Sequence, residues 1–170
     1  VNTCAYSFTV SDDSTVLYGL GAIKGVGEAA LDGIIEEREK NGAYRDLFDF
    51  CKRIDLRKAN RRVLEALIRS GALDVFDSHR ARSMASLTMA LQTAEHHLRD
   101  HAAGQNDLFG GASAVVTAES TNVDRIPQPD VPMWDDEQRL LGEKETLGLY
   151  LTGQPIERYE KELPSIVSCR

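Results

Sequence analysis

The sequence has few aromatic residues, few cysteines and no long apolar run. Aromatic residues make up 6% of the 170 residues, a proportion that favours helices packed through Leu, Ala, Ile and Val over an aromatic-rich β-sandwich. The apolar total of 42% is enough for the core of one ordinary domain or of two small ones. The composition therefore predicts a mainly α protein.

The scarcity of cysteine and of apolar runs also bears on where such a protein acts. Cys4, Cys51 and Cys169 are an odd number and form no Cys-x-x-Cys pair, so we interpret them as unpaired thiols of a reducing compartment. No apolar run approaches the roughly 18 residues that span a bilayer, and no basic segment leads an apolar stretch at the start. Since the chain begins at Val1 without an initiator Met, we expect a soluble, cytoplasmic fragment of a longer protein with no membrane partner.

Positive charge is scarce overall but concentrated in one segment. The net charge of −7 at pH 7 argues against nonspecific nucleic-acid binding by the chain as a whole. Between residues 52 and 69, however, only Asp55 and Glu65 oppose the bases Lys52, Arg53, Arg57, Lys58, Arg61, Arg62 and Arg69. The sequence therefore places a local basic patch inside an acidic chain.

Residue periodicity divides the chain into short elements. Alternation at Tyr6, Phe8 and Val10, followed by a polar turn, predicts a small β-hairpin over residues 1–18. Apolar residues at helical spacing predict helices over residues 28–40, 45–54, 56–71, 78–101 and 134–148.

Local signals refine these boundaries. Asp46 is a suitable N-cap for the second helix, and Gly71 is a suitable stop for the third. Residues 104–132 are rich in Gly, Ala, Ser, Thr and Pro without a period, which predicts a flexible linker. Residues 149–156 are expected to be a strand or an extended segment, and residues 157–164 a last helical turn or two.

Gly21, Gly25 and Gly27 lie within seven residues just before the first helix, with Lys24 among them. Glycine permits a sharp turn and a close approach to a phosphate, and the free N–H groups of a helix start attract anions. Lys24-Gly25-Val26-Gly27 resembles the hairpin of a helix-hairpin-helix motif, in which Val26 would anchor the turn. The alternative is an ordinary turn between helices, and Glu28 could itself occupy the anion position.

A second turn, Ser70-Gly71-Ala72, reads as a degenerate copy that lacks the second glycine. Basic side chains near both turns could flank the same duplex, although a solvated helix face explains them equally well. The candidate DNA-binding residues are therefore Lys24, Gly25, Val26, Gly27, Arg57, Lys58, Arg61, Arg62, Ser70 and Gly71. Contacts of this kind would position a duplex without reading its sequence.

A Leu-Phe pair stands out within the polar linker. Large apolar residues in a flexible segment indicate that a partner or the fold covers them. The segment Gln105, Asn106, Asp107, Leu108 and Phe109 resembles the short peptide by which bacterial polymerases and repair proteins bind the sliding clamp. In that mode Leu108 and Phe109 would fill an apolar pocket and Gln105 would hydrogen-bond nearby backbone. The alternative is that Phe109 folds back on the preceding helix.

Residue pairs that suggest catalysis or metal binding are weaker. The acids at 12–13 and 135–137 fall in a turn and at a helix start, where solvation and capping explain them, whereas two-metal catalysis needs a rigid scaffold. His97 and His101 are one helical turn apart, but no further ligand has suitable spacing. We therefore predict no catalytic residue and no metal site in this chain.

Four segments, in order along the chain, resemble the alpha-subunit family of bacterial DNA polymerase III, a C-family replicative polymerase. They are VLYGLGAIKGVGEAALDGIIEERE, DLFDFCKRIDLRKANRRVLEALIRSGALD, GQNDLFG and EKETLGLYLTGQPI. The resemblance implies four parts. These are a β-hairpin over 1–18 that continues from the fingers region, a tandem helix-hairpin-helix domain over 19–103, a flexible linker with a clamp-binding peptide over 104–132, and a helix and extended segment over 133–170 leading to an OB-fold absent from this sequence.

The resemblance also implies a function. A module of this kind would hold the polymerase on double-stranded DNA and tether it to the beta sliding clamp for processive synthesis, within the polymerase III holoenzyme. The parent would be a DNA-directed DNA polymerase whose catalytic carboxylates and Mg lie in an upstream palm domain, so no cofactor and no small-molecule substrate are expected here. The alternatives are a structural packing module that binds no DNA, or a DNA-repair enzyme domain that uses helix-hairpin-helix motifs.

Overall fold

The computed structural model describes residues 1–102, 129–160 and 162, with side chains described up to Arg99 in the first of these ranges. Within these residues an antiparallel β-hairpin precedes five α-helices. The strands are β1 (Thr9–Asp12) and β2 (Thr15–Leu17), and the helices are α1 (Glu28–Asn41), α2 (Leu47–Arg53), α3 (Arg61–Arg69), α4 (Arg80–Ala102) and α5 (Asp136–Leu147), with single 3-10 turns η1 (Leu20–Ala22) and η2 (Glu157–Tyr159). The predicted mainly α fold with a small N-terminal hairpin is confirmed.

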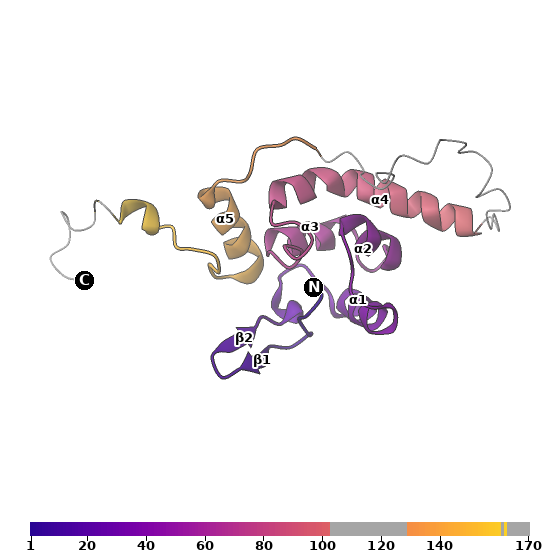
Figure 1. The fold of residues 1–170 in the computed structure, drawn as a ribbon, viewed down its shortest axis with the longest axis horizontal. Coiled ribbons are helices and arrows are strands. Elements are labelled where there is room, and N and C mark those ends of the chain that lie inside the picture. The colour runs from indigo at the N-terminus through magenta and orange to yellow at the C-terminus, as the bar shows by residue number, and fades with distance from the viewer. Residues whose placement is uncertain (103–128, 161, 163–170) are drawn as a thin grey trace, which may run out of the picture.

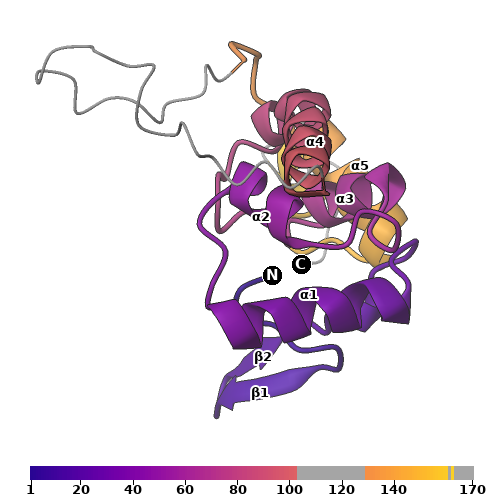
Figure 2. The same cartoon turned by 90° about the vertical axis from the view of Figure 1, so that its right-hand side faces the viewer.

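The elements stack in layers. Figure 2 shows α1 between the β-hairpin and the other helices. The long helix α4 crosses over α2 and α3, and α5 lies beside α3 (Figure 1). One continuous apolar core joins α1, α2, α3 and α4, and its fully buried side chains include Leu31, Phe50, Leu64, Leu67 and Leu87.

Local hydrogen bonds set the helix boundaries. The Asp46 carboxylate accepts the N–H groups of Phe48 and Asp49 at 2.8 Å, so the predicted cap of α2 is confirmed. Helix α3 begins at Arg61 rather than at residue 56, because the Asn60 side chain caps it. The preceding residues form a turn in which the Asp55 carbonyl accepts two backbone N–H groups.

Arg53 joins the end of α1 to α2. Its guanidinium donates to the carboxylates of Glu37 at 3.0 Å and Asp49 at 3.2 Å, and to the carbonyl of Gly42 at 2.8 Å. The same guanidinium lies 4.4 Å from the centroid of the Tyr44 ring. Charge-assisted bonds to several partners hold the connection between the two helices, so Arg53 serves the fold although it belongs to the basic segment.

The segment after α5 is not a strand. Residues 149–156 form bends and turns, η2 follows, and this part of the chain leads away from the helices (Figure 1). The backbone N–H groups of Leu151 and Thr152 donate to the Glu143 carboxylate at 2.7 and 3.0 Å. Because a side chain takes these donors, they are not available to a neighbouring strand.

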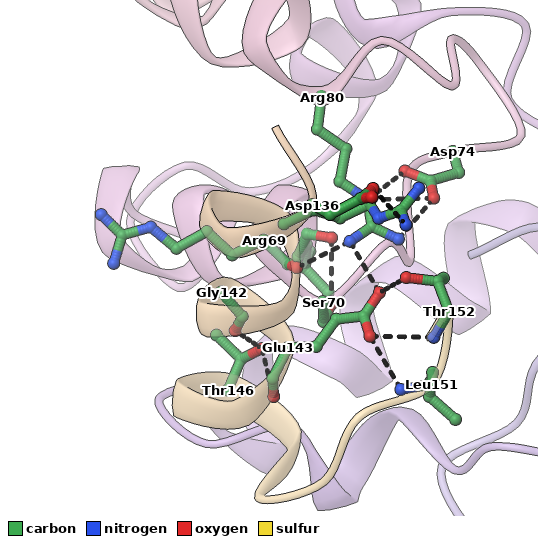
Figure 3. Close-up of polar contacts among 12 residues, drawn as sticks. Arg69, Ser70, Asp74, Arg80, Asp136, Gly142, Glu143, Thr146, Leu151 and Thr152 are labelled. Carbon is green, nitrogen blue, oxygen red and sulfur yellow. Dashed lines mark hydrogen bonds and ion pairs between the residues drawn. The ribbon is translucent and has the colours of Figure 1, made fainter. Parts of the chain in front are cut away.

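A buried ionic cluster holds α5 against the rest of the molecule (Figure 3). Arg80, at the start of α4, is 6% exposed, and Glu143, on α5, is 0% exposed. The Arg80 guanidinium donates to Glu143 at 3.0 Å and forms a bidentate pair with Asp74 at 2.7 and 2.9 Å. Buried charges are tolerated when they are paired and hydrogen-bonded in this way.

The Glu143 carboxyl is charged in the folded protein. Burial acts to raise its pKa, but hydrogen bonds from Leu151, Thr152 and Arg80 favour the carboxylate, and the pKa lies below its ordinary value. The Thr152 hydroxyl adds a further bond at 2.8 Å. Glu143 therefore connects α4, α5 and the segment that follows α5 through one side chain.

The turn between η1 and α1 depends on glycine. Gly25 has φ +86°, in the left-handed region that glycine adopts without strain. A Cβ built on Gly25 would meet nothing within 4 Å. The turn is therefore sharp and open to solvent, and its requirement for glycine comes from the backbone angle rather than from crowding.

We expect Glu143→Gln to lower the free energy of unfolding by about 3 kcal/mol near neutral pH, because the Arg80 charge loses one partner of a buried pair. The loss should shrink in acid. The wild-type carboxylate contributes its full stability above the ordinary pKa of 4.5 and loses it as the pH falls through the lower folded-state value. Urea unfolding followed by circular dichroism at several pH values measures both effects.

Glu145→Gln is the matched control, since Glu145 lies on the same helix with its side chain 54% exposed. An exposed pair contributes at most about 1 kcal/mol, so this variant should unfold close to the wild type. Equal destabilisation by the two substitutions would contradict the role given to Glu143.

Gly25→Ala should lower the free energy of unfolding by about 1 to 2 kcal/mol, because it forces an L-residue into the left-handed region. Gly33 lies inside α1, and a Cβ there also meets nothing within 4 Å. Gly33→Ala should therefore raise stability by about 0.5 to 1 kcal/mol. Calorimetric unfolding of both variants tests the opposite signs, and a neutral Gly25→Ala would show that the turn does not need glycine.

Candidate nucleic-acid interface

The start of α1 presents unpaired backbone donors. Gly27 is its N-cap and supplies no side-chain hydrogen bond. Within the described part of the chain, the N–H groups of Gly25, Gly27, Glu28 and Ala29 donate to no carbonyl or side chain. These groups, together with the positive end of the helix dipole, favour an anion at this place.

The other α-helices that the structure describes differ from α1 in this respect. Asp46, Asn60 and Asp135 cap α2, α3 and α5 with side-chain oxygens. In α4 the His79 ring accepts the Arg82 N–H at 3.1 Å. In each of these helices a side chain therefore accepts at least one N–H group of the first turn, whereas α1 has no side-chain cap.

The residues of the glycine turn before α1 differ in burial and in hydrogen bonding. Val26 is buried in the apolar core, as expected for an anchor, and its N–H donates to the Ile23 carbonyl at 3.3 Å. Lys24 is exposed, and its backbone N–H donates at 2.8 Å to the carbonyl of Thr146 near the end of α5. The Tyr18 hydroxyl donates to the next carbonyl, that of Leu147, at 3.3 Å. The end of α5 thereby supports the turn from one side.

A pocket of about 510 Å³ brings this turn together with α3 and α5. It joins Lys24 and Gly25 to the basic helix face, and its lining residues are Lys24, Gly25, Asn60, Arg62, Val63, Glu65, Ala66, Arg69, Glu145 and Thr146. Three of the predicted residues, Lys24, Gly25 and Arg62, thus meet in one groove, which we call the α3 groove.

The predicted basic residues are not equivalent. Arg57 pairs with Asp55 at 3.1 Å, and Arg61 pairs with Glu65 at 2.8 Å while also donating to the Thr88 hydroxyl. In the part of the chain that the structure describes, the side chains of Lys24, Lys58 and Arg62 form no ion pair or hydrogen bond. Charges without an internal partner are the ones most available to phosphates.

The second turn uses its polar groups internally. Gly71 has φ +80°, and the N–H groups of Gly71 and Ala72 donate back to carbonyls of α3 in the pattern of a Schellman cap. The Ser70 hydroxyl donates to the Leu67 carbonyl at 3.0 Å. A Cβ at Gly71 would collide with the Arg80 guanidinium. The two glycine turns therefore differ. The turn before α1 has N–H groups without a partner, whereas the turn after α3 uses its polar groups in hydrogen bonds within the protein.

Residues outside the prediction also line the α3 groove. Arg69 at the end of α3 belongs to the basic segment and forms an ion pair with Glu145 at 3.5 Å. The sequence placed Arg69 in the basic segment, but helical spacing alone did not predict that it lies beside Lys24. Glu145 and Thr146 enter from α5, a helix that follows the proposed linker, and no local pattern indicates that contact.

The remaining candidate residues have simpler roles or lie elsewhere. The carboxylate of Asp12 accepts the Ser14 N–H within the hairpin turn, and Asp135 caps α5. The proposed clamp-binding peptide, Gln105–Phe109, lies outside the described residues. In the described ranges no three His, Cys, Asp or Glu residues are grouped to hold a metal ion.

The described cysteines are free thiols, as interpreted from the sequence. Cys4 is partly exposed and Cys51 is buried. Burial raises the pKa of the Cys51 thiol to about 12, so this thiol packs as a small apolar group and is not reactive at neutral pH. No helix among the described residues combines the length and apolar character needed to cross a membrane.

Comparison with known proteins finds relatives along the whole chain. Residues 1–83 match the family model described as "Helix-hairpin-helix motif". The whole chain is 49% identical over 170 residues to the DNA polymerase III subunit alpha of Vibrio cholerae. It is 48% identical over 167 residues, or 98% of this chain, to that of Escherichia coli K12, and 42% identical over 170 residues to that of Haemophilus influenzae.

The chain spans about 14% of the length of each of these three relatives. Identity of this level over the full chain, together with the helix-hairpin-helix match, confirms the resemblance that the four sequence segments suggested. The chain is therefore a homologue, over its whole length, of one segment of the DNA polymerase III alpha subunit.

Proposed function

We propose that this chain holds a replicative DNA polymerase on double-stranded DNA by contacts to backbone phosphates. The observation that carries the proposal is the first turn, where the unpaired N–H groups of Gly25, Gly27, Glu28 and Ala29 accompany the unpaired charge of Lys24. Backbone donors and a flexible lysine recognise an anion without reading bases. The helix-hairpin-helix match over residues 1–83 supports the same assignment.

The α3 groove extends this contact. Arg62 lies in the same pocket as Lys24, and neither side chain forms an ion pair or hydrogen bond with the described residues. The meeting of two free bases in one groove would allow DNA binding by a chain whose net charge is −7, because phosphate contacts act locally and salt screens the more distant acids. Ser70 and Gly71 contribute less, since their polar groups are used within the fold.

The relatives support a proposal for the wider role. As part of a DNA polymerase III alpha subunit, the chain would belong to a cytoplasmic DNA-directed DNA polymerase and act with the rest of its holoenzyme. The catalytic carboxylates and the Mg ions would lie in other parts of that protein. This chain would supply DNA contacts only, and Gln105–Phe109 would bind the sliding clamp.

A packing role is the second candidate function. The β-hairpin exposes apolar side chains, with Phe8 at 55%, Val10 at 75% and Val16 at 64% exposure. Exposed apolar residues that lie together favour a protein surface against them. In this alternative the module stabilises the polymerase and binds no DNA.

Salt-dependent binding to duplex DNA separates these functions. We expect the chain to bind labelled duplexes of unrelated sequence with similar affinity, and the affinity to fall steeply between about 50 and about 200 mM salt. Lys24→Ala/Arg62→Ala should weaken binding and reduce the steepness of the salt dependence by about 1 to 2 in log–log slope. Fluorescence anisotropy across a salt series measures both.

Lys40→Ala/Arg99→Ala is the matched control, because it also removes two bases, 70% and 80% exposed, from α1 and α4. It removes positive charge outside the α3 groove and should leave the slope unchanged. If the wild type shows no salt-dependent binding, the packing role replaces the proposal. An equal loss in the control would mean that total charge, not the groove, governs affinity.

The clamp contact is tested separately. A peptide spanning residues 101–112 and the whole chain should each bind purified sliding clamp, and Leu108→Ala/Phe109→Ala should abolish both interactions by removing the apolar anchors. Isothermal titration calorimetry provides the measurement, with Gln92→Ala as a control substitution in α4. Unchanged binding in the double variant would reject Gln105–Phe109 as the clamp-binding segment.

A further inference from the structure

The α3 groove contains acidic residues that a phosphate-binding surface does not need. Glu65 and Glu145 line it together with the bases Lys24, Arg62 and Arg69. Glu65 already pairs with Arg61 at 2.8 Å, outside the lining. Glu145 instead pairs with Arg69, so an acid and a base of the groove itself neutralise one another.

The Arg69–Glu145 pair has the features of an exchangeable contact. It consists of one N–O approach at 3.5 Å, and the two side chains are 45% and 54% exposed. Exposed single-contact pairs of this kind contribute little to stability. The nearby Arg80–Glu143 pair is, by contrast, buried and multiply bonded. A phosphate oxygen that enters the groove can therefore replace Glu145 at Arg69 without disturbing the fold.

The fold nevertheless keeps Glu145 in the groove. Residues two positions apart on a helix point in nearly opposite directions, so the burial of Glu143 turns Glu145 outward. Helix α5 packs closely against the end of α3, since a Cβ on Gly142 would lie 3.4 Å from both the Cβ and the carbonyl oxygen of Arg69. The helix backbone thus keeps Glu145 next to Arg69, although the Glu145 side chain can rotate away from it.

We infer that Glu145 is an internal counter-ion that lowers the affinity of the α3 groove for nucleic-acid phosphates. In the free protein it neutralises Arg69, and in the complex a backbone phosphate takes its place at that guanidinium. The inference rests on the proposed function, because it assigns the regulation of the same surface. Its consequence is that α5 controls how tightly the groove holds DNA.

The test compares charge-matched variants of the chain for binding to labelled duplex DNA at low salt. Glu145→Gln should bind about two- to five-fold more tightly than the wild type, the range expected for release of one exposed pair. Glu36→Gln removes an acid of 68% exposure from α1 and should leave affinity nearly unchanged. Arg69→Gln/Glu145→Gln should bind no more tightly than Arg69→Gln, because the gain requires Arg69.

Three other results would overturn the inference. Equal tightening by Glu145→Gln and Glu36→Gln would assign the effect to net charge. Wild-type binding that Glu145→Gln leaves unchanged would reject the counter-ion while leaving the proposed function intact. Absence of binding by every variant would reject the proposed function and the inference together. Urea unfolding of each variant verifies that the comparison is between folded proteins.

Discussion

The buried pair of Arg80 with Glu143 determines where α5 lies, and the shape of the α3 groove depends on α5. Removing two charges from water is costly unless each is paired and its remaining hydrogen-bonding groups are satisfied. Here Asp74, the Arg69 carbonyl and Glu143 share the guanidinium, while two backbone N–H groups and a hydroxyl complete the carboxylate. An arrangement with so many directional bonds tolerates little displacement. It therefore positions α5 more narrowly than apolar packing alone would.

The position of α5 affects the candidate interface through three neighbouring residues. Glu143 points inward, Glu145 points into the groove, and the Thr146 carbonyl accepts the backbone N–H of Lys24. One helix thus supports the glycine turn, closes one side of the groove and brings a carboxylate to Arg69. Under the proposed function, a change that weakens the buried pair would alter the affinity of the groove for DNA, although neither Arg80 nor Glu143 lines it.

Sequence reasoning succeeded where the signal was local. The cap at Asp46 and the stop at Gly71 depend on bonds or backbone angles within a few residues, so residue type alone indicates them. Of the two alternatives predicted for residues 149–156, the strand is wrong, because Glu143 accepts the N–H groups of Leu151 and Thr152 that a strand would have used. The pair of Arg80 and Glu143 joins residues 63 apart in sequence, and residue periodicity does not predict such a contact. The sequence therefore indicated Lys24, Gly25 and Arg62 as candidate residues, but neither the groove that they line nor its α5 side.

Weak DNA contact suits the role we propose. A polymerase that advances along DNA must release each phosphate it holds, so tight contacts would slow it, whereas a second attachment maintains association. Linking two weak sites on one chain raises the effective concentration of each at the other. An acidic chain with a basic groove, in which Glu145 would compete for Arg69, would provide a DNA contact of limited strength. On this view the counter-ion in the groove and the proposed clamp tether are complementary: the first keeps the module mobile on DNA, and the second keeps it from being lost.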